Sequence, residues 1–259
     1  MRHQPSRHEL HDEGAGLVVQ AGDDGALTGL SGVAQASEGG EPLPEVHWSW
    51  SGIFGTFDRA QLQRGFQVYT DICSGCHSLN LVSYRNLDRI GFDEEQIKQI
   101  AAAVSVPAPP NDEGEIVDRP GLPSDKFKAP FANEQAARAS NNGALPPDLS
   151  LIVKARVGGA DYVHGILTGY GDPPADMKMA DGMNYNKYFP GHQIAMPQPL
   201  SGTEEEVDQM AKDVTAFLAW TAEPETESRK ETGVGVILFL VLLSAMMFAT
   251  KKKIWSALH

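Results

Sequence analysis

The chain has 259 residues, a formal net charge of −13 and two cysteines, Cys73 and Cys76. The acidic balance argues against direct binding to a nucleic-acid backbone, because neutralising phosphates requires an excess of Lys and Arg. Two cysteines exclude a multi-disulfide scaffold and any four-thiolate zinc or iron–sulfur site. The charge is unevenly spread: residues 1–228 hold 16 basic and 33 acidic groups, a net of −17, and basic residues predominate from Arg229 onward.

Residues 1–45 are predicted to form a poorly structured leader, because they contain few large apolar residues and show no hydrophobic period. They carry no recognisable signal-peptide pattern. From residue 46 to 228 the composition is that of a folded domain, rich in Gly and Pro and without an alternating strand pattern worth naming. This stretch is predicted to be mainly α-helical with long loops.

The first predicted helix covers residues 59–72, where Leu62, Phe66, Tyr69 and Ile72 fall roughly on one face. Such a stripe predicts that the helix packs against a core rather than standing in solvent.

The middle of the domain is predicted to alternate short helices with loops. Asp93 is placed to cap a helix that runs to residue 103. Residues 106–147 are rich in Pro, Gly, Asn and Asp and predict a long ordered loop. Further helices are predicted over 148–156 and 161–168.

The last helix before the C-terminal region has the clearest start signal. Thr203 and Glu206 have the spacing of a capping box, in which the hydroxyl and the carboxylate each accept from the other residue's amide. Val214 and Phe217 belong to an apolar stripe at helical spacing that ends at Trp220.

Residues 233–250 form an uncharged run of eighteen, which as a helix would span about 27 Å. Residues 229–259 are therefore predicted to be a transmembrane anchor with a short tail. Lys251-Lys252-Lys253 follow the run and four glutamates precede it. The positive-inside rule then predicts a cytoplasmic C-terminus and an external domain.

The chemistry is concentrated in Cys73-Ser74-Gly75-Cys76-His77. This pattern is typical of c-type haem attachment, in which two thiols form thioethers to the haem vinyl groups and the adjacent imidazole ligates the iron. Two alternatives are a redox dithiol, which is usually found in a strand–helix setting, and a zinc site, which lacks its second pair of ligands.

The surroundings of this motif resemble the class I cytochromes c. Gly65 lies eight residues before Cys73, Tyr69 lies four before it, and a late helix carries Val214 and Phe217. In that family the first and last helices cross at a small residue, and aromatic side chains pack beside the haem. Gly65 would permit such a close approach.

Longer segments resemble the cytochrome c1 family, the haem subunits of quinol–cytochrome c reductases. The likeness runs from about residue 45 to the C-terminus and is strongest in five segments: 64–69, 141–150, 167–170, 188–191 and 222–225. The leader departs from the family pattern. Some bacteria encode cytochrome b and cytochrome c1 as one precursor, which would explain a missing signal peptide.

The resemblance implies a class I haem domain with insertions, one haem c, and a place in the bacterial inner membrane with the domain in the periplasm. The expected partners are cytochrome b, a Rieske iron–sulfur protein that donates single electrons, and a cytochrome c acceptor that is basic at its docking face. A dimeric complex is also implied. The chain itself would catalyse no bond chemistry, since quinol oxidation belongs to the assembled complex.

An electron carrier is expected to use a thioether as its second axial ligand. Met196 is the preferred candidate, because the nearby Pro197 and Pro199 stiffen the loop around it and the same segment resembles the ligand-bearing loop of the family. Met210 lies on a helical apolar stripe, which favours a core position. The remaining candidates are Met177, Met179, Met183, His164 and His192.

The resemblance also implies haem-contacting residues. Arg156 would hold a haem propionate, which suits a guanidinium fork, although its simplest interpretation is a solvated helix-terminal charge. The other residues carried over as haem-wall residues are Asn141, Pro147, Tyr162 and Phe189.

Two rival functions belong to other classes. A free-standing, membrane-anchored shuttle would have no cytochrome b, and copurification distinguishes it. A haem enzyme or gas sensor would have an open sixth position and bind carbon monoxide in the ferrous form. A dithiol oxidoreductase is a more distant third.

Overall fold

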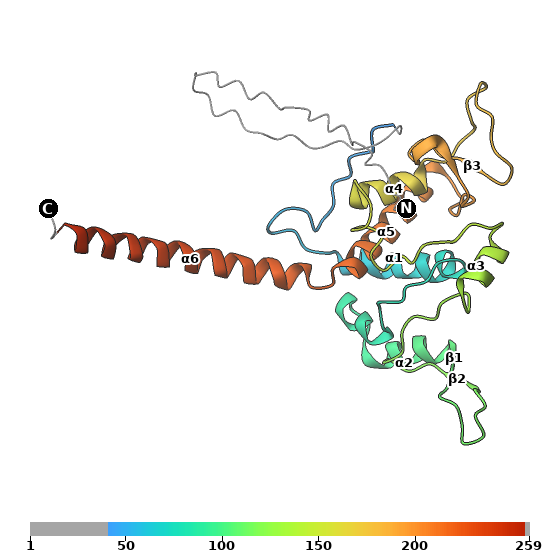
Figure 1. Cartoon of the computed structure of the whole chain (residues 1–259), viewed down its shortest axis with the longest axis horizontal. Helices are drawn as coiled ribbons and strands as arrows, with labels where there is room; N and C mark the ends of the chain where they lie inside the picture. The colour runs from blue at the N-terminus through green and yellow to red at the C-terminus, as the bar shows by residue number, and fades with distance from the viewer. Residues whose placement is uncertain (1–40, 257–259) are drawn as a thin grey trace, which may run out of the picture. The chain divides into compact units, whose positions relative to one another are not determined.

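The computed structural model describes residues 41–256, so most of the predicted leader lies outside the described residues (Figure 1). The described chain is mainly helical, as predicted. Three 3-10 helices cover Cys73–Gly75, Tyr84–Ile90 and Pro190–His192. The α-helices are α1 Arg59–Asp71, α2 Glu94–Ala102, α3 Glu134–Ser140, α4 Gly159–Thr168, α5 Glu204–Ala222 and α6 Thr226–Trp255.

The predicted helix starts at Asp93 and Thr203 are confirmed, and each is a complete capping box. Asp93 accepts from the backbone amide of Gln96, whose side chain accepts from the Asp93 amide. Thr203 and Glu206 form the same reciprocal pair at the start of α5. These contacts satisfy amides that the first helical turn leaves without partners, so local sequence alone fixes where α2 and α5 begin.

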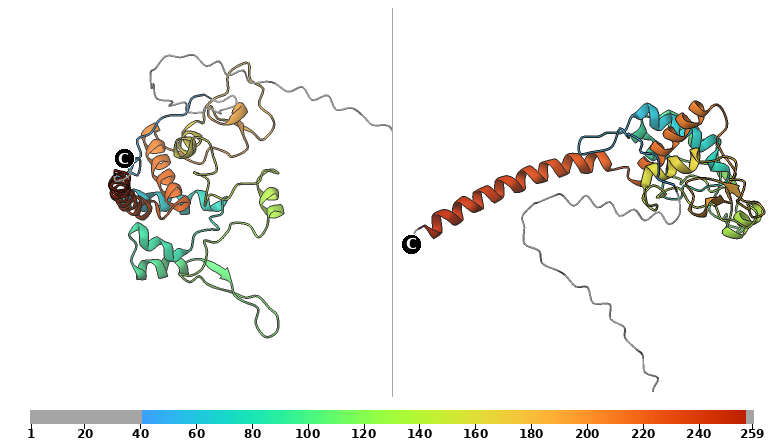
Figure 2. Two further views of the ribbon diagram at one scale, coloured as in Figure 1. Left: turned by 60° about the vertical axis from the view of Figure 1, so that its left-hand side comes forward. Right: turned by 90° about the horizontal axis from the view of Figure 1, so that it is seen from above.

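Helices α1 and α5 cross in direct backbone contact, which confirms the expectation for Gly65 (Figures 1 and 2). A Cβ atom on Gly65 would lie 2.0 Å from the carbonyl oxygen of Asp213 and 2.8 Å from Cβ of Phe217. Beside this crossing, Arg64 donates from Nε and Nη2 to the buried Asp213 carboxylate at 2.8 and 3.1 Å. The two ends of the domain are therefore joined at one point.

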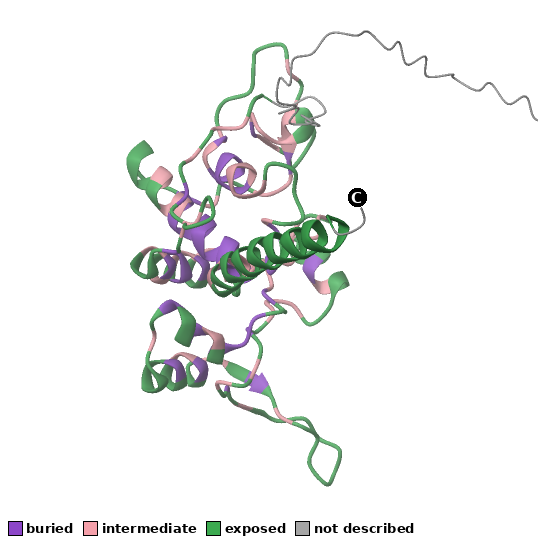
Figure 3. Ribbon diagram, turned by 90° about the vertical axis from the view of Figure 1, so that its left-hand side faces the viewer, coloured by how far each residue is buried: buried purple, intermediate pink, exposed green. Residues whose placement is uncertain are grey.

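The core surrounds this crossing (Figure 3). Phe66 of α1 packs edge-on against Phe217 of α5 and against Phe127 of the intervening loop. Tyr69 and Trp220 are 1 % exposed, so both large rings are fully enclosed. Aromatic side chains thus fill the space between the two helices and the loops that cover them.

The helix predicted over 148–156 is wrong, because this stretch forms a series of turns. Its polar side chains reach other segments instead of capping a helix. The Asp148 carboxylate accepts from Ser78 and Asn80, and the Ser150 hydroxyl accepts from the backbone amide of Leu81. Arg156 consequently follows a turn, and its interpretation as a helix-terminal charge falls with the helix.

The loop predicted over 106–147 contains regular structure that its composition hides. Helix α3 lies within it, capped by Asn133, whose side chain accepts from the amide of Ala136. Strands β1 Ser105–Pro107 and β2 Asp118–Pro120 pair antiparallel, and a second short ladder joins β3 Asn184–Tyr185 to β4 Gln193–Ile194. Strands of two or three residues are too short to show alternation.

Helix α6 is long and apolar enough to cross a membrane, and none of its apolar window is buried in the structure (Figures 1 and 3). It begins at Thr226, seven residues before the uncharged run. Its first turns are tied to the haem-motif domain by ion pairs. Glu227 pairs with Arg59, and just before the helix Glu225 pairs with Arg89. Pro224 separates α5 from α6 in the sequence.

Candidate haem site

The two thiols and the imidazole of the motif lie within one helical turn. Cys73 opens the 3-10 helix that follows α1, and its carbonyl accepts from the amides of Cys76 and His77 at 3.1 and 2.9 Å. Both cysteines are free thiols; Cys73 is half-buried and Cys76 exposed. Burial raises the pKa of Cys73 to about 12, which is unlike the low-pKa thiolate of a redox dithiol.

The imidazole of His77 is oriented by one hydrogen bond. Its Nδ1 lies 2.8 Å from the carbonyl oxygen of Pro147. Because a carbonyl only accepts, Nδ1 carries the proton and Nε2 keeps its lone pair. Burial lowers the pKa of His77, against the opposing effect of this hydrogen bond, so the neutral form that a metal requires is favoured.

These donors fit a covalently held haem. Two thiols without a disulfide stand beside an imidazole whose remaining nitrogen is a lone-pair donor, and its N–H is engaged by a carbonyl as metal-ligating histidines usually are. Haem c, when bound, supplies an iron that accepts and releases one electron at a time. The predicted pair Cys73 and Cys76 would hold it, with His77 as the proximal ligand.

Met196 lies two residues after the end of β4, on a separate, half-buried segment. Its carbonyl oxygen accepts from the hydroxyl of Tyr170 at 3.0 Å and from the side-chain amide of Asn184 at 3.3 Å. Both contacts hold the backbone and leave the thioether uninvolved. The role of Met196 as distal ligand stays a prediction.

Three of the predicted haem-wall residues contact another predicted site residue, and the other two lie at the ends of short helices. Pro147 contacts His77 through its carbonyl, and Arg156 lies beside the hydroxyl of Tyr162, where its charge opposes the rise in the pKa of Tyr162 that burial causes. Asn141 caps the C-terminal end of α3 and donates to the carbonyl of Ala137 at 2.7 Å. The fifth residue, Phe189, precedes the 3-10 helix Pro190–His192 and donates its amide to Asn186.

Most of the rival candidates contact other groups of the protein, although Nδ1 of His164 and Nδ1 of His192 are buried without a hydrogen-bond partner. His164 is buried in α4 and its Nε2 lies 2.9 Å from the Asp208 carboxylate of α5. Met210 packs against the hydrophobic core, as predicted. His192 stacks on the ring of Tyr185. Met177, Met179 and Met183 lie on the loop before β3, where Met183 is exposed.

A comparison with known protein families matches residues 48–258 to the model of the cytochrome C1 family. The chain belongs to the cytochrome C1 family. Members of this family carry a covalently bound haem c and serve as the haem electron carriers of the cytochrome bc1 complex, where they partner cytochrome b. The chain is therefore a haem electron carrier by family, and its long apolar helix α6 fits a membrane-anchored protein.

Individual relatives cover most of the chain. Cytochrome c1 of Rhodospirillum rubrum is 46% identical over 255 residues, covering 89% of this chain and 94% of that protein. The mitochondrial cytochrome c1 heme protein of Saccharomyces cerevisiae is 45% identical over 232 residues, covering 86% and 75%. A protein named cytochrome b/c1 from Bradyrhizobium diazoefficiens is 44% identical over 256 residues, which are 87% of this chain and 37% of that protein.

One positioning residue was missed by sequence reasoning. The carboxylate of Asp148 accepts from the Ser78 hydroxyl and from the amides of Asn80 and Ser150, each at 2.8 Å. It clamps the segment after His77 to the segment after Pro147. Although burial opposes it, these hydrogen bonds hold the pKa of Asp148 below its ordinary value. The only sequence signal was a carboxylate directly after Pro147.

We expect Asp148→Ala to destabilise the haem domain by about 2–4 kcal/mol, because hydrogen bonds to a charged group contribute about 1.5–3 kcal/mol each and are partly replaced by water. Chemical denaturation of the haem-loaded protein measures this loss. The His77–Pro147 hydrogen bond should loosen as well, which a shift in the haem redox midpoint detects. A matched change, Asp118→Ala on the exposed β1–β2 ladder, should leave the midpoint unchanged. Equal effects of the two variants would contradict the clamp.

Proposed function

We propose that this chain carries single electrons from a Rieske iron–sulfur protein to a soluble or tethered cytochrome c, within the quinol–cytochrome c reductase of a bacterial respiratory or photosynthetic chain. The observation that carries the proposal is the His77–Pro147 hydrogen bond beside two free thiols, in a chain of the cytochrome C1 family. It presents one imidazole lone pair where the motif attaches a haem.

The proposed site uses each residue for a distinct task. Cys73 and Cys76 would hold the haem through two thioethers, and His77 and Met196 would ligate its iron. With both ligands bound, the iron would have no open position for oxygen, which suits transfer of electrons rather than bond chemistry. Aromatic side chains and the Asp148 clamp keep the two segments around His77 in place.

The wall residues are proposed to shape the haem pocket. Arg156 would hold a haem propionate, which suits its guanidinium fork; in the structure it donates to the carbonyl of its neighbour Ala155 and lies beside the hydroxyl of Tyr162. Tyr162 beside it, together with Asn141, Pro147 and Phe189, would line the remaining wall.

The proposed topology has a leader at 1–45, a periplasmic haem domain at 46–228 and an anchor with a cytoplasmic tail at 229–259. Support comes from Lys251, Lys252 and Lys253, which follow the apolar run of α6, and from the glutamates that precede it. The bacterial inner membrane is the matching compartment. A dimeric complex with cytochrome b is proposed as the assembly.

The acceptor is proposed to be basic at its docking face, because a net of −17 over residues 1–228 attracts positive charge. We expect the second-order rate of electron transfer to a basic cytochrome c to fall at least about tenfold between low and high salt. Stopped-flow reduction from about 0.01 M to about 1 M salt covers the range over which screening lengths shrink from about 30 Å to about 3 Å. A rate that ignores salt would refute steering; an acidic acceptor serves as the control.

The function itself is tested by quinol-driven reduction of the haem in gently solubilised membranes, with and without a quinol-site inhibitor. Inhibitor-sensitive reduction, with cytochrome b and a Rieske protein copurifying, is the expected result. A haem that dithionite reduces but quinol never does, in a particle without those partners, would instead indicate a free-standing anchored shuttle.

A further inference from the structure

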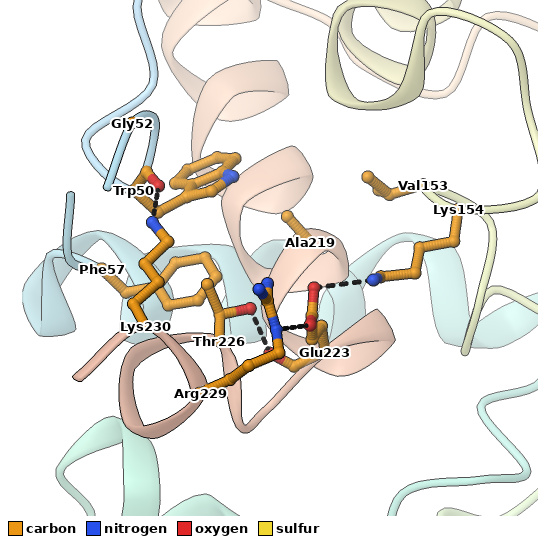
Figure 4. A pocket seen from close by; sticks show the side chains of 10 residues that line it. All are labelled: Trp50, Gly52, Phe57, Val153, Lys154, Ala219, Glu223, Thr226, Arg229 and Lys230. Atoms are coloured by element: carbon orange, nitrogen blue, oxygen red, sulfur yellow. Dashed lines mark hydrogen bonds and ion pairs between the residues drawn. The ribbon is translucent and has the colours of Figure 1, made fainter. Parts of the chain in front are cut away.

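A cavity of about 240 Å³ lies where the first turns of α6 meet the haem domain (Figure 4). We call it the junction cavity. Among the described residues, none of the proposed haem ligands lines it. Its wall combines aromatic and charged side chains: Trp50, Phe57, Lys154, Glu223, Arg229 and Lys230.

The junction cavity carries a surplus of positive charge. Three cations, Lys154, Arg229 and Lys230, line it together with one carboxylate, Glu223. Lys154 and Arg229 share that carboxylate at 2.6 and 2.5 Å (Figure 4). Their hydrogen bonds lower the pKa of Glu223 to about 2, so its carboxylate stays ionised. One negative charge then faces the two positive charges of Lys154 and Arg229, which leaves a net charge of one positive unit. With Lys230 the lining is therefore cationic inside an otherwise acidic protein.

The cations keep donors for a further ligand. The Lys230 ammonium donates to the backbone carbonyls of Trp50 and Gly55, which carry no formal charge, and an ammonium has three protons. Arg229 uses Nε for Glu223, and its side chain is still 58% exposed. An anion with several oxygens would match these remaining N–H groups.

The junction cavity also lies at the level where a membrane begins. Lys230 is three residues before Gly233, the first residue of the uncharged run, which is about 5 Å along a helix. On the loop held by Lys230, Ile53 and Phe54 are 68% and 79% exposed. Apolar side chains beside a cationic rim are typical of segments that lie in a lipid interface.

We propose that the junction cavity binds the phosphate of an anionic phospholipid, with the acyl chains lying along the exposed apolar surface of α6. Arg229 and Lys230 donate to the phosphate oxygens, and Trp50 packs beside the headgroup. Free phosphate has the same oxygens and charge, but it leaves Ile53, Phe54 and the α6 surface without an apolar partner. The lipid is therefore the ligand that uses every feature of the site.

The test uses the delipidated, haem-loaded complex in detergent, titrated with spin-labelled phosphatidylglycerol and, separately, spin-labelled phosphatidylcholine. The double variant Arg229→Gln, Lys230→Gln is compared with Lys98→Gln, which removes the same kind of charge from the solvated face of α2. Lys230→Arg keeps the charge as a rescue variant. The haem spectrum and the unfolding midpoint of each variant establish that it is folded.

We expect phosphatidylglycerol to show an immobilised component that Lys98→Gln and Lys230→Arg retain. The double variant should weaken it by about tenfold or more, the effect of losing one or two charge-assisted hydrogen bonds. An unchanged immobilised component in a folded double variant would overturn the proposal, as would complete displacement of the lipid by inorganic phosphate. If the parent protein immobilised neither phosphatidylglycerol nor phosphatidylcholine, the membrane placement of α6 would be refuted and the proposal with it.

Discussion

Replacing Met196 with leucine is expected to lower the haem redox midpoint by hundreds of millivolts, because axial-ligand choice spans roughly 0.8 V among haem proteins. The ferrous protein should at the same time bind carbon monoxide, which a six-coordinate carrier does not. Leucine has nearly the volume of methionine. The hydrogen bonds that hold this segment, from Tyr170 and Asn184, go to the Met196 carbonyl and survive the change.

Two further substitutions keep this assignment falsifiable. Met183→Leu changes an exposed thioether on the preceding loop, and Met210→Leu changes one packed against the core. Both should leave the midpoint and the carbon monoxide response unaltered. If Met196→Leu behaves like the parent and either of the others does not, the distal ligand has been placed wrongly.

Adding a single methyl group at Gly65 is expected to destabilise the haem domain by about 3 kcal/mol or more, the upper part of the overpacking range. The new Cβ atom would lie 2.0 Å from the Asp213 carbonyl oxygen, and backbone atoms cannot rotate away. Alanine is the better helix former by about 1 kcal/mol, so the steric penalty must exceed that gain. Thermal unfolding measures the loss, at about 2–4 °C per kcal/mol for a domain of this size.

Gly171→Ala is the matched control for this experiment. The same methyl group meets no atom within 4 Å there, and the residue has no positive φ. Its effect should stay within about 0.5 kcal/mol. A Gly65→Ala protein as stable as the control would mean that the two helices separate more readily than their crossing indicates.

The elements that can be predicted from the sequence are those whose stabilising signals are local. The helices beginning after Asp93 and Thr203 carry their own caps, and the apolar run of α6 needs no tertiary partner to be recognised. Gly65 was identified through its spacing from Cys73. In each case the interaction that fixes the element lies within a few residues or follows from a family pattern.

Local signals do not predict the conformation of segments that are held by hydrogen bonds to distant parts of the chain. Leu149, Ile152 and Val153 have helical spacing, yet Asp148 and Ser150 bond to the segment around residues 78–81 and hold the chain in turns. The hydrogen bond between His77 and the Pro147 carbonyl joins residues 70 positions apart. No periodicity within either segment encodes such a contact.

The crossing of α1 and α5 has a consequence for biosynthesis. Arg64 and Asp213, which pair beside it, are 149 residues apart, and closing so long a loop carries an entropic cost before its contacts repay it. A chain made from its N-terminus presents Cys73 and Cys76 long before Asp213 exists. If these thiols attach the haem as proposed, they would be accessible while α1 still lacks the helix it packs against. The covalent bonds would then keep the haem on a domain that later unfolds.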